Sequence, residues 1–204
     1  VLGGHISTGV VVLPDGAPAP DLPAGVRLHR ASHPLPDTRS IDAARDVRRI
    51  LEDAGDRDRV LVLLSGGGSA LLTDPESGLD LEAIRRAHQI LIASGWPIGM
   101  VNDARRVLDR LKGGGMARLA HPAATVGLVL SDIPGGSLDD VASGPLSPAK
   151  RTARDVEIAL RRDGLWESMP DDVCAALKAR RSEPAGAAPP IALHALGSGS
   201  AVLE

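Results

Sequence analysis

Hydrophobic residues along the chain fall into short continuous runs separated by longer stretches of helical periodicity. Three runs of strand length are almost wholly apolar, at residues 60–64, 126–130 and 191–196. Such runs are typical of parallel strands that are covered on both faces of a sheet. Two further runs, at residues 9–13 and 26–30, predict additional strands. The pattern therefore predicts an α/β domain with a mostly parallel sheet.

The segments between these runs carry apolar residues three and four positions apart, as amphipathic helices do. Ser40 is a suitable N-cap for the first of them, since a serine hydroxyl can accept a hydrogen bond from a free backbone amide. The sequence offers this helix no adjacent helix with which it could form a helical hairpin, so we expect its apolar face to pack on the sheet. The predicted helices cover residues 40–55, 80–95 and 98–112, with two more that begin near Thr152 and Pro170.

Composition and charge narrow the choice of ligand. The 204 residues suffice for one domain with a sizeable core, but Phe and Tyr are absent and only Trp96 and Trp166 are aromatic. Base stacking is therefore not expected, and a formal net charge of -3 gives no basic excess for nucleic acid or an anionic membrane. No apolar run approaches the roughly 20 residues of a membrane helix, and no signal-peptide pattern opens the chain. The single Cys174 suits a reducing cytoplasm, so we expect a cytoplasmic protein with a small-molecule ligand.

Directly after the run at residues 60–64 stands a glycine loop, Ser65-Gly66-Gly67-Gly68-Ser69. Ligands of parallel sheets bind beyond the carboxyl ends of the strands, where backbone amides converge on anions. Three glycines remove the Cβ atoms that would block this approach, and the two serine hydroxyls can donate hydrogen bonds. We therefore predict that the loop binds a polar, phosphorylated ligand. The alternative is a tight strand-to-helix turn with no ligand.

The glycine loop does not match three common catalytic motifs. A Walker A motif would need Gly-Lys-Ser/Thr at the correct spacing, which is absent. Both the dinucleotide fingerprint and the serine hydrolase elbow would need a glycine where Leu71 stands. Covalent catalysis by Ser69 is therefore disfavoured.

A second group of polar residues lies on the predicted helix 98–112 and in the glycines that follow it. One asparagine and two arginines lie three and four residues apart, so they are expected to share a face and to offer donors to an anion. A solvated face is the alternative, and a lysine at a helix end also complements the helix dipole. We predict substrate or phosphate contacts for Asn102, Arg105, Arg106, Gly113 and Gly114, and a catalytic role for Lys112.

A third group follows the strand predicted at residues 126–130. A carboxylate at a strand end can hold Mg²⁺ or orient a hydroxyl for phosphoryl transfer, although it can also cap its own backbone. We predict that Asp132 is a catalytic and metal-binding residue and that Ser143 and Gly144 contact substrate or phosphate. No pair of histidines has the spacing of a metal site, and His33 is the only one in a distinctive loop.

In order and spacing, these motifs resemble the glycerate 2-kinases with a C-terminal MOFRL domain, a family also labelled hydroxypyruvate reductase. The resemblance implies a Rossmann-like three-layer sandwich over residues 1–204. It further implies ATP-dependent phosphorylation of D-glycerate at its 2-hydroxyl, with Mg²⁺, in a cleft between this domain and the MOFRL domain. The motifs that carry it are HPLPD at 33–37, VLVLLSGGGSALL at 60–72, SG at 94–95, NDARR at 102–106, LKGGGMA at 111–117, LSD at 130–132, ASGP at 142–145 and GS at 197–198.

The resemblance also implies parts that this chain is expected to lack. These are a first strand-helix unit with a Gly-Lys motif and the MOFRL domain, which are expected to supply a lysine and an arginine to the cleft. Several polar positions of the family pattern differ as well, so a non-catalytic ligand-binding or regulatory relative stays open as an alternative to a kinase. Reduction of hydroxypyruvate is a further alternative. The family tends to have Glu, His, Ser, Asp and Asn where this chain has Met100, Val107, Asp109, Gly136 and Gly199.

Overall fold

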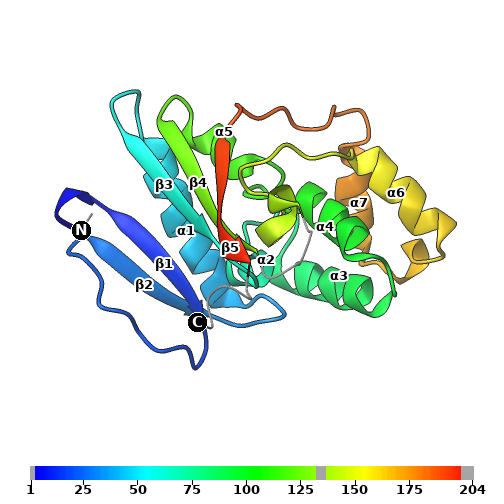
Figure 1. The fold of residues 1–204 in the computed structure, drawn as a ribbon. Coiled ribbons are helices and arrows are strands. Elements are labelled where there is room, and N and C mark those ends of the chain that lie inside the picture. Colours follow the sequence, from blue (N-terminus) through cyan, green and yellow to red (C-terminus); the bar gives the residue numbers. More distant parts are fainter. Residues whose placement is uncertain (1–2, 132–136, 199–204) are drawn as a thin grey trace.

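The computed structural model describes residues 3–131 and 137–198 and contains two parallel sheets (Figure 1). The first sheet pairs β1 with β2, and the second has the strand order β3-β4-β5. Parallel pairing in both sheets, with helices packed beside them, confirms the predicted α/β class. The strands are β1 (Gly9–Pro14), β2 (Val26–Ala31), β3 (Arg59–Leu64), β4 (Ala124–Ser131) and β5 (Ala192–Ser198).

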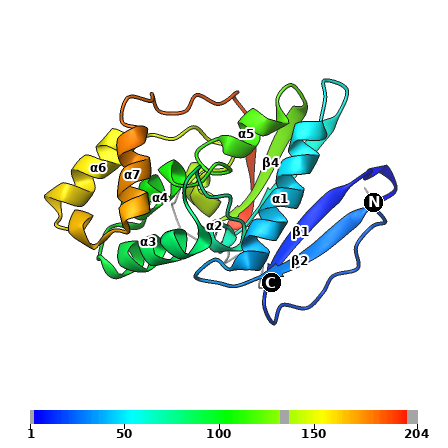
Figure 2. The same ribbon diagram turned by 180° about the vertical axis from the view of Figure 1, so that it is seen from behind.

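The crossover connections of the β3-β4-β5 sheet contain helices, whereas residues 15–25 connect β1 to β2 without one. Figure 2 shows α1 and α5 lying over the sheet, while α3, α4, α6 and α7 form a separate group beside it. Within the described ranges, no helix has the length and apolar character needed to cross a membrane. The α-helices are α1 (Thr38–Asp53), α2 (Gly68–Leu71), α3 (Leu81–Ala93), α4 (Ile98–Val107), α5 (Gly115–Ala120), α6 (Ala153–Arg162) and α7 (Asp171–Ala179), and the 3-10 turns are η1 (Gly3–His5), η2 (Leu138–Ser143) and η3 (Trp166–Ser168).

Helix α1 begins one turn earlier than predicted. Its N-cap is Asp37, whose Oδ1 accepts a hydrogen bond from the Ser40 amide at 3.2 Å. Ser40 Oγ in turn accepts a hydrogen bond from the Asp37 amide at 3.1 Å. This reciprocal capping box satisfies two amides that a single N-cap would leave partly open. The prediction that Ser40 is the N-cap is therefore wrong, and Ser40 supports the helix start from inside the first turn.

Helix α4 ends at Val107, well before the predicted end at residue 112. Beyond it the chain turns back, and the Arg110 amide donates a hydrogen bond to Asp74 O at 2.8 Å. The Asp109 carboxylate stabilises this turn because it accepts hydrogen bonds from the amides of Leu111 at 2.9 Å and Asp74 at 3.1 Å. The glycines at 113–115 therefore follow a side-chain-stabilised turn rather than a helix end.

Two hydrophobic clusters hold the elements in place. One lies among α3, α4, α6 and α7, and it includes Ile84, Leu160 and Val173. The other lies between the β3-β4-β5 sheet and the helices α1 and α5, and it includes Leu51 and Val62. The glycine loop 65–69 follows the carboxyl end of β3, and α2, which begins within this loop, lies between the sheet and the group of α3, α4, α6 and α7 (Figure 1).

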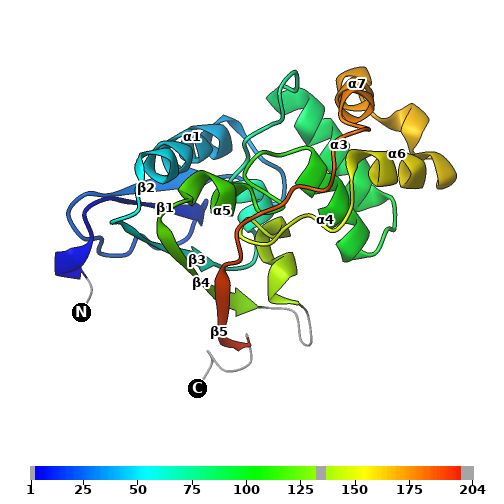
Figure 3. The ribbon, with the colours of Figure 1, turned by 90° about the horizontal axis from the view of Figure 1, so that it is seen from above.

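One face of the β3-β4-β5 sheet is open in this chain. Leu61 and Leu63 of β3 are 49% and 66% exposed, and Val126, opposite Leu61 on β4, is 38% exposed. Because side chains alternate along a strand, α1 and α5 cover only the face that carries Val62 (Figure 3). The prediction that the run at 60–64 is covered on both faces is therefore wrong for this chain.

A substitution on the open face of the sheet and one in the helical core should change the free energy of unfolding by very different amounts. Leu63→Thr on the open face should change the free energy of unfolding by less than about 0.5 kcal/mol, since little apolar area is lost from the core. Leu160→Ala removes a 1% exposed side chain and should cost about 2–5 kcal/mol. Urea unfolding of the 204-residue chain measures both, and equal losses would show that the open face is covered in solution.

Candidate functional site

Three loops that lie far apart in the sequence converge at the end of β3. Gly113 and Gly114 donate amide hydrogen bonds to the carbonyls of Ser143 and Gly144, at 3.2 and 2.8 Å. The hydroxyls of Ser69 and Ser143 are 2.7 Å apart. The glycine loop 65–69, the turn 112–115 and the loop 142–145 therefore form one structure, and the predicted ligand residues in them are brought together.

The glycine loop itself is open to solvent at its start and packed at its end. Ser65 and Gly66 are exposed, whereas Gly67, Gly68 and Ser69 are half-buried. An added Cβ on Gly68 would lie 2.7 Å from the Ala142 Cβ, so glycine is needed there for close packing of the two loops. The loop thus has an exposed start, at Ser65 and Gly66, which a ligand could contact, and an end that is fixed by packing against Ala142.

Gly67 shows a second reason for glycine in the same loop. Its φ of +81° is in the left-handed region, and an added Cβ would lie 3.2 Å from His33 Cδ2. The exposed His33 ring therefore lies against the glycine loop, which places the HPLPD segment at the edge of the site.

The loop 142–145 holds an unusual backbone. Ala142 and Ser143 have φ values of 53° and 62°, which non-glycine residues rarely adopt, and Gly144 follows with 64°. An added Cβ on Gly144 would lie 2.5 Å from Asp139 O, so this position accepts only glycine. Left-handed conformations at two successive non-glycine residues persist only where surrounding contacts impose them, and they concentrate at functional sites.

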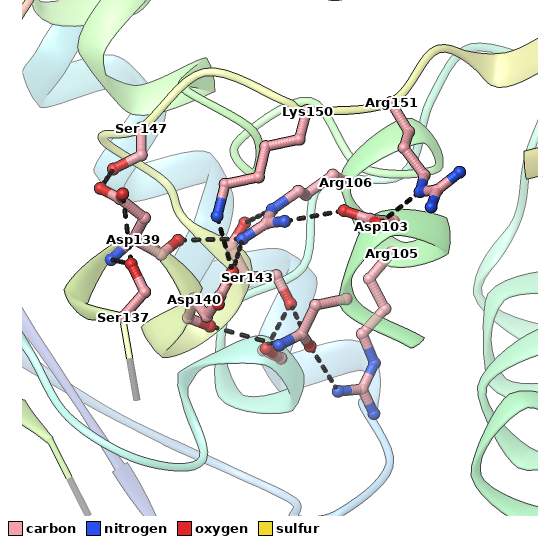
Figure 4. A network of polar contacts seen from close by, with 12 residues as sticks. Asp103, Arg105, Arg106, Ser137, Asp139, Asp140, Ser143, Ser147, Lys150 and Arg151 are labelled. Atoms are coloured by element: carbon pink, nitrogen blue, oxygen red, sulfur yellow. Dashed lines mark hydrogen bonds and ion pairs between the residues drawn. The ribbon is translucent and has the colours of Figure 1, made fainter. Parts of the chain in front are cut away.

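A chain of polar side chains runs through the base of the site (Figure 4). Asn102 Nδ2 donates a hydrogen bond to Asp140 O at 3.3 Å. Asn102 Oδ1 accepts hydrogen bonds from Ser143 Oγ at 3.1 Å and from Arg105 Nη1 at 3.4 Å. Through Ser143 the chain continues to Ser69 in the glycine loop. Asn102 thereby links the strained loop to a buried cation.

Arg105 is that buried cation, and among the residues that the structure describes it has no carboxylate partner. It is 8% exposed, its Nε has no hydrogen-bond partner, and its one polar contact is the long hydrogen bond to Asn102. Burial lowers the pKa of the guanidinium, which shows how poorly this environment solvates the charge. A bound anion would supply the missing charge-assisted hydrogen bonds.

The neighbouring Arg106 is fully engaged in internal contacts. All three guanidinium nitrogens take part, since Nη1 pairs with Asp103 at 2.9 Å, Nη2 with Asp140 at 2.6 Å, and Nε donates to Ser143 O at 3.2 Å. Its side chain is 2% exposed. Asn102 and Arg106 thus contact the same 139–143 segment, and Arg105 joins them through Asn102, but the donors of Arg106 are taken by internal partners. Of the two arginines, only Arg105 lacks a counter-charge among the described residues. The internal contacts of Arg106 make it a clamp between α4 and η2.

Lys112 is also enclosed. It is 2% exposed and forms an ion pair with Asp109, while its Nζ donates a hydrogen bond to Leu72 O at 3.0 Å. Burial lowers the pKa of Lys112 and raises that of Asp109, and the ion pair between them opposes both shifts. In this arrangement Lys112 holds the turn 112–115, and its predicted catalytic role would require the pair to open. The spacing of Asp109 and Lys112, three residues apart, is the one sequence signal that could have revealed this partner.

Asp132, the predicted catalytic and metal-binding residue, lies outside the described residues. Within the described part of the chain, no three His, Cys, Asp or Glu side chains gather as a metal site. The nearby carboxylates have other partners, since Asp139 accepts a hydrogen bond from Ser147 at 2.7 Å and Asp140 pairs with Arg106. The described residues thus do not supply a ligand set for Mg²⁺, and the magnesium site stays a prediction.

A buried histidine lies behind the site. His88 of α3 is 2% exposed, and its Nδ1 has no hydrogen-bond partner. Burial and the charges of Arg105 and Lys112 hold its pKa well below the usual 6.5. His88 is therefore neutral at pH 7 and adds no second buried positive charge behind Arg105.

Comparisons with known proteins place the chain among glycerate kinase relatives. A family model described as "Domain of unknown function (DUF4147)" matches residues 2–178. D-glycerate 2-kinase of Thermotoga maritima is 39% identical over 171 residues, which cover 82% of this chain and 40% of that protein. Glycerate kinase of Bos taurus is 35% identical over 198 residues, covering 91% of this chain and 38% of that protein. A putative hydroxypyruvate reductase of Agrobacterium vitis is 43% identical over 138 residues, covering 68% of this chain and 35% of that protein.

The fold agrees as well. The crystal structure of glycerate kinase from Thermotoga maritima superposes with a TM-score of 0.84 at 35% identity, over 96% of this chain and 46% of that one. This chain therefore spans less than half the length of the relatives that it matches.

The two adjacent arginines should respond oppositely to removal of their charge. Arg106→Met should lower the free energy of unfolding by about 3 kcal/mol, because the carbonyls of Ser143 and Asp139 lose their side-chain donor while Asp103 and Asp140 keep only the more exposed Arg151 and Lys150. Arg105→Met should leave it unchanged or raise it, since the lost cation has no counter-charge in the ligand-free chain. Urea unfolding of both variants decides this, and a large loss for Arg105→Met would reveal a structural partner.

His88 should make the folded state sensitive to acid. Its folded pKa is depressed, so below pH 6.5 the unfolded state binds a proton that the folded state does not, and stability falls as the pH falls. Wild type should therefore lose up to about 1.4 kcal/mol per pH unit more than His88→Leu in this range. Above pH 7 the two unfolding curves should shift in parallel. An identical acid-side slope in both proteins would contradict the buried neutral imidazole.

Proposed function

Since this chain belongs to the DUF4147 family of N-terminal glycerate kinase domains, we propose that it forms the anion-binding half of a glycerate kinase site. The proposed reaction transfers the γ-phosphoryl group of ATP to the 2-hydroxyl of D-glycerate and yields 2-phosphoglycerate and ADP. The chain spans 40% of the Thermotoga maritima D-glycerate 2-kinase, so we assign the reaction to a protein of that length that contains this domain.

Arg105 is the observation that carries this proposal. A buried guanidinium without a carboxylate partner is costly, and the cost is recovered when a ligand supplies the anion. Both D-glycerate, through its carboxylate, and ATP, through its phosphates, are anions of the required kind. We assign Arg105 and Asn102 to the charge of the ligand, because they lie together at the base of the three converging loops.

The loops above Arg105 suit the remainder of such a ligand. Ser65 and Gly66 at the start of the glycine loop are exposed, and the glycine turn 113–114 is held against Ser143 and Gly144. Phosphoryl transfer depends mainly on positioning and electrostatics, which a rigid loop cluster provides. We propose phosphate contacts for Ser65, Gly66, Gly67, Gly68, Gly113 and Gly114, with Ser143 and Gly144 supporting them and Asp132 as the group that orients the acceptor hydroxyl.

A second candidate function follows from the name of one relative, the putative hydroxypyruvate reductase of Agrobacterium vitis. Such a reduction would require a nicotinamide cofactor, and Leu71 stands where the dinucleotide fingerprint needs glycine. We therefore favour the kinase. Oxidation of NADH or NADPH on addition of hydroxypyruvate to the longer protein would reverse this preference.

Asn102→Asp provides a specific test of the Arg105 site. The new carboxylate would stand where Asn102 Oδ1 lies, 3.4 Å from Arg105 Nη1, and would neutralise the cation without enlarging the side chain. We expect the affinity for D-glycerate or ATP, measured by titration calorimetry, to fall about tenfold to a hundredfold. Gln89→Glu, which adds the same charge on an exposed part of α3, should bind as wild type does.

The kinase reaction has its own decisive assay. The longer protein, given ATP, Mg²⁺ and D-glycerate, should release ADP in proportion to 2-phosphoglycerate. No ADP above background would reject the kinase, and nucleotide or glycerate binding without turnover would favour a non-catalytic relative. Unchanged affinity in Asn102→Asp would instead reject only the role of Arg105.

A further inference from the structure

The polar chain at the base of the site has a defined hydrogen-bond direction, which begins at Asn102. Its amide has one pure acceptor neighbour, Asp140 O at 3.3 Å, and one pure donor neighbour, Arg105 Nη1 at 3.4 Å. The amide nitrogen must therefore face Asp140 and the amide oxygen must face Arg105. The reverse orientation would oppose two acceptors on one side and two donors on the other.

With Asn102 oriented in this way, the direction of the next two hydrogen bonds follows. Ser143 Oγ lies 3.1 Å from Asn102 Oδ1, which can only accept a hydrogen bond. The single hydroxyl proton of Ser143 is therefore donated to Asn102. Ser69 Oγ lies 2.7 Å from Ser143 Oγ and must then donate to it. Ser143 is fully buried, so no solvent molecule offers it another proton or partner. Ser69 is left with free lone pairs and without a free proton.

We infer that Ser69 is a specificity-determining hydrogen-bond acceptor, and that the ligand atom seated on it is a hydroxyl of a hydroxy acid rather than a phosphate oxygen. This inference rests on the proposed function, because it places the acceptor substrate in the same site. Ser69 is only half-buried, in contrast to Ser143, and Ser143 and Asn102 connect it to the unpaired cation Arg105. A molecule that carries both a carboxylate and a hydroxyl matches this pair. The expectation that both serines of the glycine loop donate to phosphate is thereby revised.

A phosphate oxygen on Ser69 would meet lone pairs instead of a proton. To donate to it, Ser69 would have to give up its bond to Ser143, and the buried Ser143 Oγ would lose its only donor. Ser143 and Asn102 are in this sense positioning residues, which act on the ligand through Ser69.

Three small probes separate the two possibilities by titration calorimetry on the 204-residue chain. D-glycerate offers a carboxylate and hydroxyls, propionate offers the same carboxylate without a hydroxyl, and the inorganic phosphate dianion offers three charged oxygens that can only accept, beside one P–OH. Wild type should prefer D-glycerate to propionate. Ser69→Ala should weaken D-glycerate about tenfold, to the level of propionate, while the affinities for propionate and phosphate stay within about twofold.

Variants of Ser143 test the direction of the chain. Ser143→Ala should tighten phosphate binding, because the Ser69 proton is then free to donate. Ser143→Gly makes the same change and suits the left-handed φ of 62°, so it replaces the alanine variant if that protein does not fold. Ser147→Ala removes another buried serine of the same segment, whose proton goes to Asp139, and should leave all three affinities unchanged.

The outcomes distinguish this inference from the proposed function. Loss of phosphate affinity in Ser69→Ala as large as the loss for D-glycerate would show that Ser69 donates, and would overturn the inference alone. An unchanged preference for D-glycerate over propionate in Ser69→Ala would do the same. Failure of wild type to bind either D-glycerate or ATP would overturn the proposed function itself.

Discussion

The site depends on the clamp that Arg106 makes between α4 and η2. The buried guanidinium meets Asp103 on its own helix and Asp140, Asp139 O and Ser143 O on the other element. These contacts hold the 139–143 segment against α4 and support its left-handed backbone. The hydrogen bonds of Asn102 with Asp140 O and Ser143 Oγ add to the clamp and hold Ser143 beside Asn102. Because Arg106 is buried and paired with two carboxylates, it positions the loop and does not itself offer donors to a ligand.

Charge pairing divides the cations around the site into two classes. Arg106 and Lys112 are buried with carboxylate partners, and each stabilises one of the converging loops. Arg105 is buried without one, and the depressed pKa of His88 means that no second positive charge lies behind it at pH 7. A buried ion pair contributes little beyond its own desolvation, but it neutralises a charge where it stands. Arg105 is therefore the buried group near the site whose charge a bound anion would compensate.

The fold places this cation at a boundary. The helical cluster of α3, α4, α6 and α7 provides Asn102 and Arg105, whereas the sheet with α1 and α5 provides the glycine loop at the end of β3. Ser143 joins the two through hydroxyl and amide contacts of 2.7 and 3.1 Å. A ligand at this boundary touches both packed units, so its binding is sensitive to how they are held together. The opposite face of the sheet carries exposed leucines and takes no part in the site.

The sequence by itself determined the α/β class, the five strands and the motifs of the glycerate kinase family, because these depend on local periodicity and on residue spacing. It also indicated that residues 65–69, 102–106, 112–115 and 142–145 belong to one site, through their joint resemblance to that family. Only the tertiary structure decided what each residue does there. Arg105 and Arg106 are identical side chains at adjacent positions, and they differ because Asp140 reaches one and not the other. Asp109 pairs with Lys112, so the ammonium group is not free for a ligand. Ser69 donates its proton to Ser143, whose own proton goes to Asn102, and can therefore only accept from a ligand. Counter-charges and hydrogen-bond directions come from contacts between segments distant in the chain, which no local pattern records.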